Sequence, residues 1–131
     1  MRYLLDTHVA LALANGAMGS LPRPMQSLLN DTSNGFVVSV VTLWEIAIKV
    51  RLGKLALSTN LEELPAQLAI LGIEILNVGL VHTLTEVEPS PPTNDVFDQM
   101  LLAVSQVECC RFVTLDRALR DHPLAWRPAS A

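Results

Sequence analysis

Apolar residues gather in four short runs spaced along the whole chain. Each run is rich in aliphatic or β-branched residues and gives way to a polar or turn-forming residue, which is typical of buried strands. The run FVVSVV is nearly continuous, as expected for a strand that is covered on both faces. Strands are therefore expected at residues 2–5, 36–41, 73–77 and 111–116.

Helical periodicity fills most of the segments between these runs. Thr7 and Thr42 stand where they would cap two of the helices, while Gly53 and Gly72 stand where helices end. Three prolines within residues 88–94 indicate a loop. Helices are expected at residues 8–14, 23–31, 42–52, 58–72, 79–87, 95–108 and 117–122.

The alternation of strands and helices predicts an α/β fold, with a central parallel sheet flanked by helices on both faces. A chain of 131 residues is enough for one domain, so residues 1–131 are expected to form a single unit. The last segment, residues 123–131, has no clear pattern, and we expect it to fray.

Composition narrows the class of protein. Hydrophobic residues make up 50% of the chain and charged residues 17%, which favours a large core and an apolar surface for a partner. The net charge of −4 argues against nucleic-acid binding by charge alone. No apolar stretch reaches the ~18 residues of a membrane span, and the adjacent cysteines fit no disulfide framework, so we expect a soluble cytoplasmic protein.

Four acidic residues fall at or near the carboxyl ends of the expected strands, where open parallel sheets gather their functional groups: Asp6, Glu45, Asp98 and Asp116. Taken singly, each aspartate is well explained as a helix cap. Glu45 interrupts an apolar helix face, and a salt bridge to Lys49, four residues later, would explain it alone. The convergence of all four acids on one edge favours a functional site.

Four charged carboxylates repel one another unless a cation lies among them. Mg²⁺ and Mn²⁺ prefer carboxylate oxygens, whereas zinc is disfavoured because the three histidines are scattered and no thiol joins the set. Such an ion suits phosphodiester hydrolysis, since it activates water and neutralises charge on the phosphate. Lys49 and Arg51 would add positive charge nearby.

Longer stretches carry a family resemblance. The segments LLDTHVALALA, VVSVVTLWEIAIKVRLGKLAL, NDVFDQMLLAVSQ and FVTLD occur in the order and spacing of the PIN-domain ribonucleases. The chain resembles in particular the toxins of VapBC-type toxin–antitoxin modules. The resemblance implies an α/β/α sandwich and a Mg²⁺- or Mn²⁺-dependent endoribonuclease, whose cleavage leaves a 5′-phosphate and a 3′-hydroxyl.

The resemblance also implies roles for individual residues. The acidic quartet of the family falls on Asp6, Glu45, Asp98 and Asp116 as metal ligands and catalytic groups. Thr114 and Asp95 match supporting polar and acidic positions, and Lys49 matches a lysine that contacts RNA phosphate or orients Glu45. The chain departs from the family where Thr93 and Asn94 replace a basic pair and Val96 replaces a proline.

The implied partners are a cognate antitoxin protein and an RNA substrate, with a homodimer and a toxin–antitoxin hetero-oligomer as the expected assemblies. Two alternatives stay open. A PIN-like interaction module without turnover would explain the missing basic pair but not four retained acids. A nuclease for structured DNA shares the metal site but normally carries helical arches, for which this chain is short.

Overall fold

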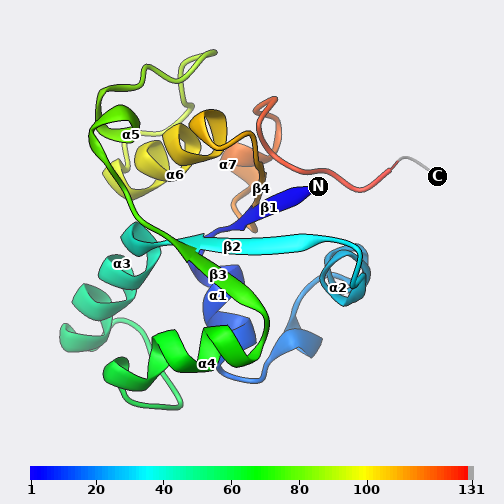
Figure 1. Ribbon diagram of the computed structural model, residues 1–131, viewed down its shortest axis with the longest axis vertical. Coiled ribbons are helices and arrows are strands. Elements are labelled where there is room, and N and C mark those ends of the chain that lie inside the picture. Colours follow the sequence, from blue (N-terminus) through cyan, green and yellow to red (C-terminus); the bar gives the residue numbers. More distant parts are fainter. Residues whose placement is uncertain (130–131) are drawn as a thin grey trace.

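A four-stranded parallel sheet forms the centre of the protein in the computed structural model, which describes residues 1–129 (Figure 1). The strands follow the order β3-β2-β1-β4, so the first strand lies inside the sheet and the third lies at an edge. All pairings are parallel, with Leu4 opposite Val37 and Leu5 opposite Val113. The strands are β1 (Arg2–Leu5), β2 (Gly35–Ser39), β3 (Ile73–Leu76) and β4 (Arg111–Val113).

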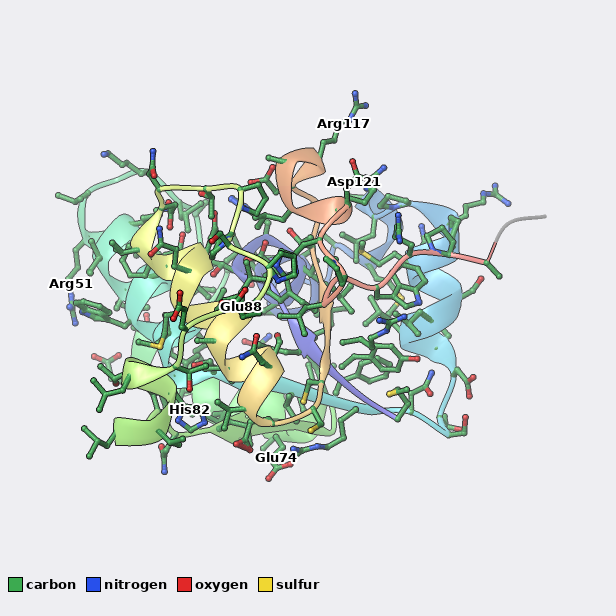
Figure 2. All side chains as sticks on the ribbon, turned by 90° about the horizontal axis from the view of Figure 1, so that it is seen from above. Arg51, Glu74, His82, Glu88, Arg117 and Asp121 are labelled. Atoms are coloured by element: carbon green, nitrogen blue, oxygen red, sulfur yellow. The ribbon has the colours of Figure 1, made fainter. Side chains whose placement is uncertain are left out.

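Helices cover both faces of the sheet, so the expected α/β sandwich is confirmed. In Figure 1, α1, α2 and α4 lie below the sheet and α5, α6 and α7 above it, while α3 flanks one side. Figure 2, seen from above, shows α6 lying across the sheet beneath the loop of Glu88. The helices are α1 (Thr7–Ala14), α2 (Arg23–Asn30), α3 (Val40–Arg51), α4 (Leu64–Ile70), α5 (Leu80–Leu84), α6 (Val96–Val107) and α7 (Arg117–Arg120), with 3-10 turns at Met18–Ser20 and Leu61–Glu63.

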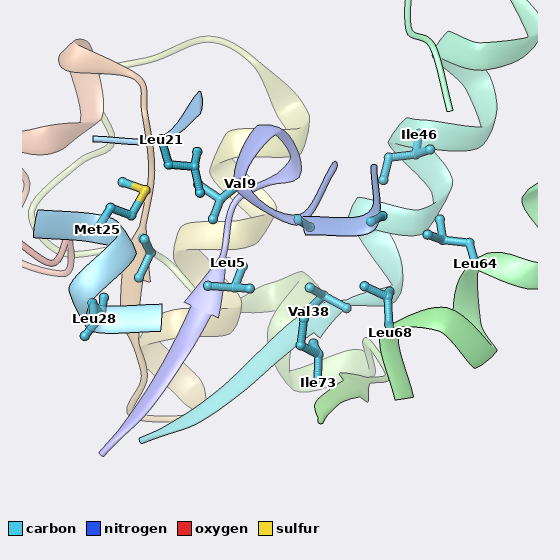
Figure 3. Packing of buried hydrophobic residues seen from close by; sticks show 13 residues of the cluster. Leu5, Val9, Leu21, Met25, Leu28, Val38, Ile46, Leu64, Leu68 and Ile73 are labelled. Carbon is cyan, nitrogen blue, oxygen red and sulfur yellow. The ribbon is translucent and has the colours of Figure 1, made fainter. Parts of the chain in front are cut away.

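Strand alternation divides the apolar side chains between two cores. Leu5 and Val38 pack into the lower core, between the sheet and helices α1, α2 and α4, which Figure 3 shows. Their neighbours Leu4 and Val37 point to the opposite face and pack with α6. This follows from the two-residue period of a strand, and it explains why the sequence runs are apolar throughout rather than alternating.

Two helix starts differ from the sequence prediction. Asp6, not Thr7, caps α1, because the Asp6 carboxylate accepts the Thr7 N–H. Ser39, not Thr42, caps α3, since its hydroxyl accepts the Val41 N–H at 3.0 Å. The strand β2 therefore ends two residues earlier than expected, and Thr42 lies buried within the first turns of the helix.

The segment after α7 is more ordered than the sequence suggested. The Phe112 N–H donates to the Leu124 carbonyl and the Trp126 N–H donates to the Phe112 carbonyl, at 2.8 and 2.7 Å. Ala125 thereby extends the sheet beside β4 in a single parallel bridge. The expected fraying is wrong for residues 123–126, while residues 130–131 lie outside the described part of the chain.

Among residues 1–129, none of the helices combines the length and apolarity that a membrane span requires.

Candidate active site

One cleft of about 330 Å³ opens where the strands end. Parallel pairing brings these ends together, since Leu5 lies opposite Val113 and the N–H of Asp6, one residue beyond β1, donates to the Val113 carbonyl. The cleft thus collects side chains from the starts of α1, α6 and α7 and from the middle of α3. Its lining consists of Asp6, His8, Glu45, Lys49, Asp95, Asp98, Leu115 and Asp116.

Asp6 is a buried carboxylate of the cleft, held by two hydrogen bonds. Only 5% of the residue is exposed, and its Oδ1 accepts the Thr7 N–H at 2.7 Å. Its Oδ2 accepts the Thr114 hydroxyl at 2.6 Å. Burial raises the pKa of Asp6, and the nearby Glu45 charge adds to that rise, while both hydrogen bonds oppose it. The side chain therefore has a fixed orientation and an environment that favours a nearby cation.

Glu45 is equally buried and has two partners within the protein. Its Oε1 accepts the Thr7 hydroxyl at 2.6 Å, which ties α3 to the start of α1. Its Oε2 accepts from the Lys49 ammonium at 2.5 Å, so the ion pair within the helix is present. The hydrogen bond from Lys49 to Glu45 raises the pKa of the lysine, which keeps it charged at neutral pH. Glu45 therefore both forms the salt bridge and lines the cleft.

Asp98 carries the largest electrostatic perturbation in the cleft. Burial, followed by the charges of Asp6, Asp95, Glu45 and Asp116, raises its pKa to about 7. The acids predicted from separate strand ends thus line one cleft, and their charges add to the effect of burial on Asp98.

The start of α6 places Asp98 in the cleft. Asp95 is the helix cap, and its Oδ1 accepts the Asp98 N–H at 3.0 Å. The Thr93 hydroxyl in turn accepts the Asp95 N–H at 3.1 Å. Thr93, which stands where the family resemblance led us to expect a basic residue, thus supports the turn that leads into the helix.

Asp116 lies at the mouth of the cleft and is exposed. It caps α7 by accepting the Ala118 N–H, so its cap role and its place in the cleft coexist. Its own N–H donates to the Thr114 hydroxyl at 3.0 Å. Because the same hydroxyl donates to Asp6, Thr114 couples the acids that follow β1 and β4.

Sequence reasoning overlooked three residues here. His8 and Leu115 line the cleft, and the Thr7 hydroxyl orients Glu45. A useful signal was available for His8, since a residue two positions after a helix-capping Asp lies in the first turn beside it. Arg51, by contrast, is exposed and outside the cleft lining, at the far end of α3 in Figure 2.

Comparison with known proteins connects this geometry to a family. A sequence model of the PIN domain matches residues 3–123. The chain belongs to the PIN-domain family. No curated protein sequence matches this PIN domain closely enough to add a relative.

Solved structures share the fold of this PIN domain at low sequence identity. One is VapBC2 from Rickettsia felis bound to a DNA fragment from its promoter, with a TM-score of 0.63, 20% identity and coverage of 95% of this chain and 96% of that chain. Another is a toxin–antitoxin complex from Klebsiella pneumoniae, with a TM-score of 0.62, 17% identity and coverage of 98% and 99%. Both similarities concern the fold.

The donor set of the PIN-domain cleft suits a hard divalent cation. Its ligating atoms are carboxylate oxygens, and the perturbed Asp98 shows that the cluster would gain from positive charge. Within residues 1–129, however, no three acidic, histidine or cysteine side chains are grouped closely enough to hold one ion together. Mg²⁺ commonly binds one or two carboxylates and keeps several waters, so the chemistry fits without a closed cage of protein ligands.

Proposed function

We propose that this PIN domain is a metal-dependent endoribonuclease and the toxin of a toxin–antitoxin module. The observation that carries the proposal is the acidic cleft, in which burial and the charges of the neighbouring acids raise the pKa of the Asp98 carboxyl to about 7. Family membership and the two toxin–antitoxin structures with the same fold support it. The proposed cofactor is Mg²⁺ or Mn²⁺, which Asp6, Glu45, Asp98 and Asp116 would hold partly through bound waters.

A bound divalent cation would supply an activated water and neutralise charge that develops on the phosphate. The protein contributes orientation. Asp6 is fixed by Thr114 and the start of α1, so its oxygens face the cleft without a search among rotamers. Glu45 is fixed by Thr7 from one side and Lys49 from the other.

Lys49 has a second use in this proposal. It is the one lysine or arginine among the side chains that line the cleft, and its bond to Glu45 keeps it protonated. A charged ammonium beside the acids offers a hydrogen bond to an RNA phosphate oxygen. When RNA enters, Lys49 can exchange its bond to Glu45 for the phosphate and release a carboxylate oxygen for the cation.

The proposed partners are RNA and an antitoxin protein, with a homodimer as the basic assembly in the cytoplasm. Several large apolar side chains are exposed on neighbouring elements, which supports a protein partner: Trp44 on α3, Leu80, Val81 and Leu84 on α5, and Val96 on α6. An antitoxin arginine or lysine reaching the carboxylates would inhibit the site, since a guanidinium or ammonium satisfies the same oxygens as the metal.

Cleavage of a labelled mixed RNA pool by purified protein tests the proposal. The reaction is run with Mg²⁺, with Mn²⁺ and with EDTA, beside a DNA pool of matched length. Asp6→Asn should abolish metal-dependent cleavage. Asp31→Asn is the matched control, because Asp31 likewise accepts a backbone N–H and a hydroxyl, both from Ser33, but lies before β2, at the amino ends of the strands and outside the cleft lining. It should retain full activity.

A binding module without turnover is the second candidate. Two observations favour it. Side chains of the same protein already hydrogen-bond to oxygens of Asp6 and Glu45. Within residues 1–129, no three potential metal ligands are grouped closely enough to hold one ion. Mn²⁺ titration separates the two candidates. If the folded protein neither binds Mn²⁺ nor cleaves RNA, the nuclease proposal is contradicted. If the native protein cleaves RNA in the presence of metal and Asp6→Asn does not, the binding module without turnover is excluded.

A further inference from the structure

A second concavity lies beside the acidic cleft, between the start of α2, α7 and the C-terminal segment. It encloses about 210 Å³. Its walls are largely apolar, unlike those of the acidic cleft. They are formed by Pro22, Pro24, Met25, Trp126 and Pro128, with Arg120 and Thr114 as the polar members.

Thr114 connects this pocket to the proposed catalytic site. Its side chain donates to Asp6 on the cleft side and accepts the Asp116 N–H. The same residue lines the apolar pocket. A polymer that places a phosphate among the acids can therefore reach the pocket with an adjoining unit.

The pocket is built on fixed parts of the fold. The Trp126 backbone is held in the bridge to β4, and its ring packs against the lower core. Pro22 and Pro24 have restricted backbones at the start of α2, so they form a rigid opposing surface. A preformed pocket of this kind binds a flat ring at little cost in ordering.

We propose that this pocket binds one nucleobase of the RNA substrate, with the ring stacked on Trp126 and a neighbouring phosphate on Arg120. The inference rests on the proposed ribonuclease function and gives it a specificity subsite. An aromatic surface beside a cation matches the two chemical parts of a nucleotide, the π-face of its base and its phosphate.

The surrounding charge supports a nucleic acid over an apolar protein segment. Arg120 is exposed and takes no part in the ion pairs found among residues 1–129. Arg117, at the start of the same helix, points away from the domain in Figure 2. Arg120 thus supplies, from α7, a positive charge at the pocket, whereas the loop before α6 has the uncharged Thr93 and Asn94.

Fluorescence of the 131-residue protein in EDTA tests base binding without turnover. Trp44→Phe leaves Trp126 as the sole tryptophan of the chain. Titration with short RNA homopolymers of each base should quench its emission, and at least one base should bind more tightly than the others. In the native background, Trp126→Leu keeps an apolar side chain but removes the stacking surface, and should weaken RNA binding measured by anisotropy roughly 5- to 150-fold.

Arg120→Gln guards against a folding artefact, because the side chain is exposed and packs in neither core. It should weaken binding and reduce the slope of log affinity against log salt by about 0.7, the effect of one lost phosphate contact on a single strand. Trp44→Leu is the matched control, since Trp44 does not line the pocket. It should change neither the RNA affinity nor the slope of log affinity against log salt.

The outcomes separate this inference from the function on which it rests. Cleavage by the native protein with an unchanged KM in Trp126→Leu and Arg120→Gln would overturn the base pocket and leave the nuclease intact. Absence of quenching by every homopolymer would also overturn it. Quenching without any cleavage by the native protein would support the pocket and count against the nuclease.

Discussion

Replacing Asp98 by Asn should stabilise the metal-free protein at alkaline pH. Asp98 sits among four other acids of the cleft, and burial and their charges raise its pKa to about 7. An ordinary aspartate has a pKa of 3.8. The folded protein without metal therefore holds the charged form of Asp98 at a cost that the unfolded chain does not bear. Asn removes the charge and keeps the shape.

The direction with pH follows from linkage. A carboxyl whose pKa is raised by folding binds its proton more tightly in the native state, so its contribution is fully present below pH 3.8 and is lost as the pH rises through about 7. The whole difference between the pKa values of the unfolded and folded states would correspond to about 4 kcal/mol, at ~1.36 kcal/mol per pKa unit. Asp98 is partly exposed, and solvent screening reduces this to about 1–2 kcal/mol.

A smaller effect opposes the gain. Asp98 lies in the first turn of α6, where a negative charge interacts favourably with the helix dipole by about 0.3–1 kcal/mol. We therefore expect Asp98→Asn to raise the free energy of unfolding by about 1 kcal/mol at pH 8 and to change it little at pH 4.

Urea denaturation in EDTA, followed by tryptophan fluorescence between pH 4 and pH 8, measures this difference. Asp31→Asn is the control with the opposite sign, because hydrogen bonds from Ser33 lower the pKa of Asp31 and favour its charged form. Adding Mg²⁺ should stabilise the native protein more than the Asp98→Asn variant. A ligand stabilises the folded state according to its affinity for it, and the variant lacks the Asp98 carboxylate that is proposed to bind the ion. A variant no more stable than the native protein at pH 8, or one with the same advantage at pH 4, would refute the reasoning.

Two further substitutions test how the cleft is supported. Thr7→Val removes the hydroxyl that Glu45 accepts, so it should destabilise the fold by about 1–3 kcal/mol and weaken Mn²⁺ binding; an unchanged urea midpoint would show that water replaces the bond. Ser39→Ala removes the cap of α3 and should lower the free energy of unfolding by about 1 kcal/mol, whereas a loss within experimental error would mean that the Val41 N–H finds another acceptor.

Much of the architecture could be predicted from local sequence. Val37 and Val38 are consecutive apolar residues that face opposite cores, and this marks a strand covered on both sides. Asp6 and Asp116 follow such strands, so their placement at one edge needed only the parallel direction of the sheet. The position of Glu45 in an apolar helix face was the strongest single indication of a site.

Other features depend on contacts between residues far apart in the sequence. Thr7 was expected to be a cap, but its hydroxyl reaches Glu45, 38 residues away, and the cap is the residue before it. Ordering of the segment at Ala125 depends on pairing with β4, since the segment has no clear pattern of its own.

Sequence alone thus determined the class of fold and the acids that could form a site, because strand burial, helix periodicity and residue type are local properties. Only the tertiary structure decided which oxygens of Asp6 and Glu45 are held, by which hydroxyls, and that Thr114 stands between the acidic cleft and the pocket of Trp126. The physical reason is that hydrogen bonds and pocket walls form between side chains whose proximity arises only when the sheet aligns its strand ends.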